Sequence, residues 1–135
     1  MKPLTATFAF FLIAFATASI AQDKVTTVPV AFAKGSSSAS LKGNLGGYDS
    51  VNYTLGAKGG QTMTVKISGS SNANFNVFAP GDRPGSSTAL GSGSVGSNWS
   101  GTLPASGTYT IQVYQMRASV RRGEQVPFNI NFQIH

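Results

Sequence analysis

The sequence has no cysteine and a single histidine among its 135 residues. Without cysteine the chain can form neither disulfide bonds nor thiolate metal sites, so the folded state must be stabilised by core packing. The histidine, His135, is the final residue, and no serine stands in a Gly-x-Ser-x-Gly elbow followed by a usable acid and histidine. These absences exclude cysteine nucleophiles and argue against a serine hydrolase.

Acidic residues are scarce as well, with Asp23, Asp49, Asp82 and Glu124 as the full set. Two of these carboxylates could in principle form a glycosidase pair after folding. Simpler interpretations exist, because Asp23 lies beside an expected cleavage site, Asp82 lies in a Pro-Gly-Asp turn and Glu124 follows a cluster of arginines. With no Asp-x-Asp run and no histidine cluster, the sequence predicts no catalytic residue, no metal site and no cofactor.

Residues 1–21 have the pattern of a secretory signal peptide. Lys2 gives a positive start, an apolar run follows from Phe8 to Phe15, and small-x-small spacing predicts cleavage after Ala21. The apolar run is short against the roughly 20 residues that a membrane span needs. We therefore expect a chain of residues 22–135 that is exported to the periplasm or secreted, forms one domain and is not inserted in the membrane.

Alternation of apolar and polar residues predicts that this chain forms short β-strands. The strongest instance is the segment 126–134, whose inward side would carry Val126, Phe128, Ile130, Phe132 and Ile134. Shorter alternating segments at 25–32, 39–45, 48–55, 61–68, 75–78, 98–103 and 109–114 are separated by turn residues. About seven or eight strands without helical periodicity favour an all-β fold, an antiparallel β-sandwich, with a barrel as the alternative.

Particular residues refine this prediction. Pro29 cannot donate a ladder hydrogen bond, which places the first strand at a sheet edge. The Gly/Ser-rich run 81–97 is predicted to be a flexible loop, with Leu90 as its one large apolar anchor. Trp99 is expected in the core, whereas an exposed Trp99 beside Tyr114 would indicate a platform for stacking sugars.

A basic insert, MRASVRRGE, separates the last two strands and holds Arg117, Arg121 and Arg122. Arg117 and Arg121 share a face whether the insert is one helical turn or extended, and Gly123 is a plausible stop. One interpretation is a solvated loop whose arginines pair with Glu124 and Asp49.

The other interpretation is that the guanidinium groups grip an acidic partner, because they bind carboxylates or phosphates bidentately. Nucleic acid, an anionic polymer and an acidic protein cleft are the candidates. Export and the lack of a continuous basic stripe with aromatic residues argue against nucleic acid.

Several segments resemble the periplasmic inhibitors of goose-type (g-type) lysozyme. They are FAKGSSSA at 32–39, Gly47-Tyr48-Asp49 with Tyr53, AKGGQ at 57–61, LPASG at 103–107 with Tyr109, and Arg117-x-x-x-Arg121 with Phe128-Asn129-Ile130. They occur in the family's order over nearly the whole expected mature chain. Members of that family are exported β-sandwich proteins of Gram-negative bacteria that block the substrate cleft of the lysozyme.

The resemblance implies that g-type lysozyme is the partner. It also implies that Tyr48, Arg117 and Arg121 form one protruding patch that enters the cleft, with Asp49 and Arg122 as neighbours. A lysozyme cleft carries catalytic carboxylates, which an arginine would complement in charge.

Two alternatives stay open. The sandwich also resembles domains that follow secreted peptidases, which suggests a non-catalytic envelope module for anionic polymer or peptidoglycan. A structural envelope protein would instead have its arginines tied to Asp49 and Glu124.

Overall fold

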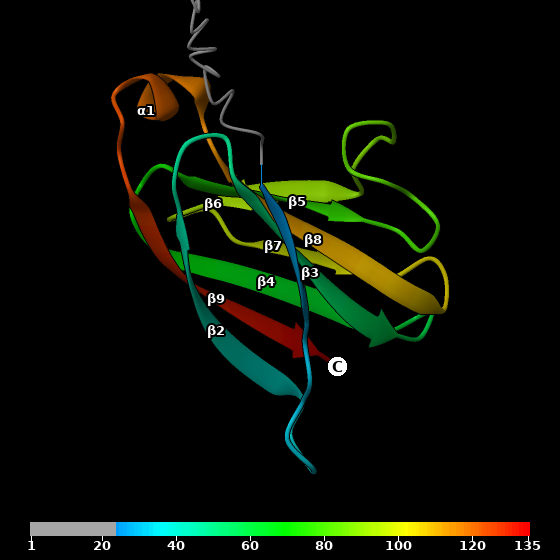
Figure 1. Ribbon diagram of the computed structural model, residues 1–135. Helices are drawn as coiled ribbons and strands as arrows, with labels where there is room; N and C mark the ends of the chain where they lie inside the picture. Colours follow the sequence, from blue (N-terminus) through cyan, green and yellow to red (C-terminus); the bar gives the residue numbers. More distant parts are fainter. Residues whose placement is uncertain (1–23) are drawn as a thin grey trace, which may run out of the picture.

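The computed structural model describes residues 24–135, which form two β-sheets packed face to face and one short helix (Figure 1). The predicted signal peptide lies outside the described residues. The strands are β1 (Val25–Pro29), β2 (Ser38–Leu45), β3 (Ser50–Ala57), β4 (Thr62–Gly69), β5 (Ala73–Phe78), β6 (Gly91–Ser94), β7 (Trp99–Thr102), β8 (Gly107–Gln115) and β9 (Val126–Ile134). The helix is α1 (Arg117–Arg121).

The strand order confirms the predicted β-sandwich. One sheet has five strands in the order β1-β3-β8-β5-β6, and the other has four in the order β2-β9-β4-β7. Every named pairing is antiparallel except that of β1 with β3, which is parallel. The first strand lies at a sheet edge, as Pro29 predicted, although it ends there instead of running on to Phe32.

The core lies between the two sheets and is built from the alternating residues of their inner faces. Val126, Phe128, Ile130 and Phe132 of β9 are buried, and Ile134 is half-buried against them. Their counterparts in β8 and β3 include Ile111, Tyr53 and Leu55. Each fully buried side chain of this size stabilises the fold by about 1.5–3 kcal/mol.

Aromatic packing joins the two sheets. The Tyr53 ring lies edge-on to Phe128, with ring centroids 6.4 Å apart, and 5.5 Å from Phe132. Burial between the sheets raises the pKa of the Tyr53 phenol above its ordinary value, because the charged form is desolvated there.

The prediction that 81–97 is a flexible loop was wrong for part of the run. Gly91–Ser94 forms the edge strand β6, paired with β5. A Cβ atom at Gly91 would overlap the Trp99 indole, and one at Gly93 would overlap the Phe75 ring. Glycine serves close packing here, and Trp99 is half-buried against the core. Leu90 is 41% exposed, so its side chain does little to anchor the run. Its backbone N–H does more, because it donates a hydrogen bond to the Val77 carbonyl.

Candidate partner-binding site

The basic insert folds as one helical turn. Its backbone N–H groups at Val120 and Arg122 donate to the carbonyls of Met116 and Ala118 at 3.2 and 3.3 Å. Gly123 has a φ of 70°, in the left-handed region, and ends the helix as expected. Arg117 and Arg121, at its two ends, are four residues apart and therefore lie on the same side.

Ser119 and Gln115 attach the inner side of α1 to the sandwich. Ser119 is 1% exposed, and its hydroxyl oxygen lies 2.8 Å from both the Gln115 side-chain oxygen and the Met116 carbonyl. The Gln115 amide nitrogen donates to the Gly47 carbonyl at 2.8 Å. One buried amide thus joins the start of the insert to the turn that carries Tyr48.

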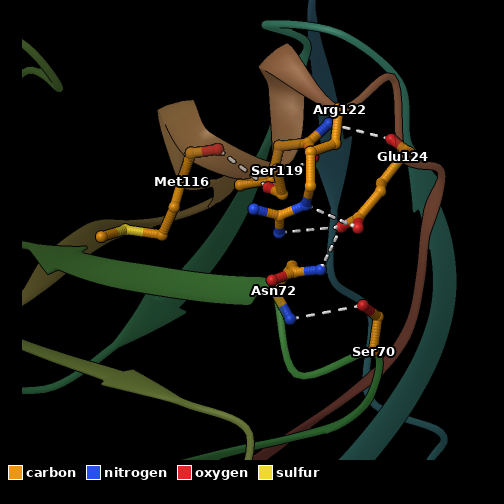
Figure 2. Close-up of polar contacts among 7 residues, drawn as sticks. Ser70, Asn72, Met116, Ser119, Arg122 and Glu124 are labelled. Atoms are coloured by element: carbon orange, nitrogen blue, oxygen red, sulfur yellow. Dashed lines mark hydrogen bonds and ion pairs between the residues drawn. The ribbon is translucent and has the colours of Figure 1, made fainter.

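A second set of polar contacts holds the end of the insert (Figure 2). Arg122 Nε donates to Glu124 Oε1 at 2.8 Å, and Asn72 Nδ2 donates to Glu124 Oε2. The hydrogen bond from Arg122 lowers the pKa of the Glu124 carboxyl and raises the pKa of Arg122. The Asn72 backbone N–H donates to Ser70 Oγ at 3.3 Å, so the contacts tie the loop after α1 to the β4–β5 turn.

Three of the five site residues predicted from the sequence lie together. Tyr48, Asp49 and Arg117 line an open groove of about 630 Å³ between the β2–β3 turn and α1. Tyr48 is 51% exposed and Asp49 is half-buried, with Asp49 Oδ1 accepting the Lys24 backbone N–H at 3.1 Å. Arg121 is exposed on the same helix but does not line the groove.

The arginines differ in how they are engaged. Figure 2 shows Arg122 directed toward Glu124, with which it forms the one ion pair found within residues 24–135. Arg117 and Arg121 have no acidic partner in that part of the chain. The alternative in which all three arginines are tied up by Asp49 and Glu124 therefore holds for Arg122 alone.

Comparison with known proteins identifies the family. No family model matches the sequence. The chain is 37% identical over 107 residues to the inhibitor of g-type lysozyme of Escherichia coli (strain K12), which covers 79% of this chain and 80% of that protein. The chain belongs to the g-type lysozyme inhibitor family. The sequence resemblance is thereby confirmed.

Solved structures of the inhibitor family have the same fold. The crystal structure of Aeromonas hydrophila PliG, a periplasmic inhibitor of g-type lysozyme, matches with a TM-score of 0.81 and 65% identity over 84% of this chain and 99% of that one. The pre-peptidase C-terminal domain of a Bacillus anthracis collagenase matches with a TM-score of 0.56 at 12% identity, over 82% of this chain and 96% of that one, a likeness of fold alone. Family membership agrees with the prediction that the protein is not an enzyme.

Other elements of the inhibitor fold bear on the alternatives. Trp99 packs against the core and does not line the groove that Tyr114 lines, so the two do not form a common sugar-stacking platform there. Across residues 24–135 there is no group of side chains suited to a metal ion. The same stretch holds no helix of the length and apolarity that a membrane crossing requires.

Sequence reasoning missed the residues that hold the site in this inhibitor fold. Gln115, Ser119 and Asn72 make the contacts that fix the insert. One signal was present, because Gln115 continues the inward phase of Tyr109, Ile111 and Val113 in β8. A polar residue at an inward position must find a hydrogen-bond partner.

Proposed function

We propose that this protein is exported to the periplasm and inhibits g-type lysozyme by occupying its substrate cleft, without chemistry of its own. Tyr48, Arg117 and Arg121 would form the contact patch, with Asp49 and Arg122 as neighbours. The observation that carries the proposal is that Tyr48 and Arg117, from opposite parts of the sequence, line one groove. The relatives named as inhibitors of g-type lysozyme support it.

The positive charge of the proposed contact patch would complement the negative charge of a lysozyme cleft. Arg117 and Arg121 are exposed and free of acidic partners within the described part of the chain, so both guanidinium groups can bind carboxylates. A glycosidase cleft holds a pair of catalytic carboxylates. Arginine and tyrosine are also the residue types that dominate interface hot spots.

Asp49 and Arg122 would act on the patch indirectly. Asp49 accepts the Lys24 backbone N–H and so fixes the turn after Tyr48. Arg122 bonds Glu124 and holds the end of the insert. We expect both to orient the contact residues, with fewer direct contacts of their own.

The first test measures lysis of a cell-wall suspension by g-type lysozyme, with c-type and i-type enzymes alongside. The purified chain 22–135 should protect the walls from the g-type enzyme, and Arg117→Ala/Arg121→Ala should raise the inhibition constant at least about a hundredfold, since hot-spot truncations cost about 2 kcal/mol or more each.

The matched control is Lys34→Ala/Lys58→Ala, which removes the same charge from exposed turns that do not line the groove. It should inhibit like the wild type. Equal loss in both double variants would contradict the patch and indicate an effect of net charge. Failure of the wild-type chain to protect against any g-type lysozyme at micromolar concentration would overturn the proposed function.

A further inference from the structure

Exposed apolar side chains gather at the groove. Four large hydrophobic residues are exposed within residues 24–135, and three of them line it: Val25 at 56%, Tyr48 at 51% and Met116 at 55%. The fourth, Leu90, lies elsewhere on the surface. Single exposed hydrophobic residues are ordinary, whereas a gathered set is typical of an interaction surface.

The backbone segments that line the groove are held by contacts within the fold itself. Val25 begins the edge strand β1 and pairs with Ser50, two residues after Tyr48. The hydrogen bond from Gln115 to the Gly47 carbonyl holds the Tyr48 turn beside the start of the insert, where Met116 lies. A preformed groove loses little conformational entropy on binding.

The Met116 side chain is 55% exposed and is not part of the core cluster. The residue supplies only its carbonyl, which accepts the Val120 backbone N–H and lies 2.8 Å from the Ser119 hydroxyl. Figure 2 shows its thioether extending away from the polar contacts around Glu124. Methionine in such a position adapts its shape to an apolar partner.

The charged residues beside the groove indicate which kind of protein segment could bind in it. Arg117 directly follows Met116 and has no acidic partner in the described part of the chain, while Asp49 is engaged by the Lys24 backbone. The groove therefore offers apolar surface next to a free guanidinium group. It fits a segment that presents an apolar side chain beside a carboxylate.

We propose that the groove receives an apolar side chain from the rim of the g-type lysozyme cleft, with Val25 and Met116 forming an apolar arm of the interface beside the arginines. This inference rests on the proposed function. The apolar contact would contribute affinity that salt does not screen, because burial of apolar surface is not an interaction between charges.

The test compares inhibition constants at low and high ionic strength. Met116→Ser should weaken inhibition about tenfold, by a similar factor at both salt concentrations, and Met116→Leu should restore most of the loss. Val25→Ser should act in the same direction by a smaller factor. The cost of Arg117→Ala should shrink as salt rises.

Leu90→Ser is the matched control, because it removes an exposed large hydrophobic residue away from the groove. It should leave inhibition unchanged at either salt concentration. Thermal melts establish that each variant is folded, and sedimentation shows whether the groove instead joins two copies of this chain.

The outcomes separate the two proposals. If the wild type inhibits while Met116→Ser and Val25→Ser inhibit as well as Leu90→Ser, the apolar arm is overturned and the proposed function stands. If Met116→Ser dissociates a dimer without weakening inhibition, the groove is a self-association surface and the apolar arm is again overturned. If the wild type inhibits no g-type lysozyme, the proposed function fails and takes the apolar arm with it.

Discussion

Gln115 occupies an inward position of β8, in phase with Ile111 and Val113, where an apolar side chain is the rule. Its amide nitrogen donates to the Gly47 carbonyl, 68 residues away in the sequence, and its oxygen accepts the Ser119 hydroxyl. The contact with Gly47 depends on the tertiary fold, so residue spacing could not predict it. Tyr48, Arg117 and Arg121 were predicted because a known family resembles this chain at those positions.

Replacement of Gln115 by leucine tests this bridge. Gln115→Leu keeps the volume but leaves the Gly47 carbonyl without its donor, so we expect the free energy of unfolding to fall by about 1–3 kcal/mol. The inhibition constant should also rise, because the Tyr48 turn and the insert are no longer joined. Urea denaturation and the lysis assay measure the two effects.

A control of the same residue type lies at the other end of the sandwich. Gln133→Leu in β9 removes a hydrogen bond to Asn131 and should leave inhibition unchanged. Loss of stability without any loss of inhibition in Gln115→Leu would mean that the bridge supports the fold but not the site.

At the scale of elements, α1 shows where the sequence was ambiguous. The spacing of four between Arg117 and Arg121 suits a helical turn and an extended strand equally. The burial of Ser119 on the side facing Gln115 decides for the helix. Composition alone could not reveal this, since Ser119 is a small polar residue in an otherwise basic segment.

The loop after α1 is held by a carboxylate, which makes it sensitive to acid. Hydrogen bonding from Arg122 lowers the folded-state pKa of Glu124 below its usual value near 4.5. A group with a lowered pKa stabilises the fold above its unfolded value, and the contribution disappears as the pH falls through the folded-state pKa. Wild type should therefore be more stable than Glu124→Gln at pH 6, and the difference should vanish below the lowered pKa.

Urea denaturation of both proteins over a series of pH values from 6 downward measures this difference. It should be small, because the pair is exposed and screened by solvent. Asp82→Asn, in the turn after β5, serves as the control for removal of an acid as such. A stability difference between wild type and Glu124→Gln that does not diminish anywhere in the acidic part of the series would contradict the assignment.

At the scale of the whole molecule, the sequence predicted the β-sandwich fold but not which strands pair with one another. Alternation in β8 and β9 gave the inward faces, because a period of two is a local property. The parallel pairing of β1 with β3 depends on contacts between distant segments, and no local pattern records it. The flexible loop predicted for the Gly/Ser-rich run was partly wrong for a similar reason. Glycines are typical of flexible loops, but they also allow a close approach of the backbone to a side chain such as Trp99.

The two ends of the described chain lie at different ends of the sandwich (Figure 1). Lys24, the first described residue, directly precedes Val25 of the groove, whereas the backbone of His135 forms hydrogen bonds with that of Thr62 at the start of β4. Because residue 24 directly precedes a residue of the groove, we expect a purification tag or surface tether placed immediately before residue 24 to weaken inhibition. The same addition after His135 should leave it unchanged. Paired fusions in the lysis assay would measure this, and equal inhibition by both would contradict it. We therefore expect the C-terminus to be the better point for immobilising or displaying this protein.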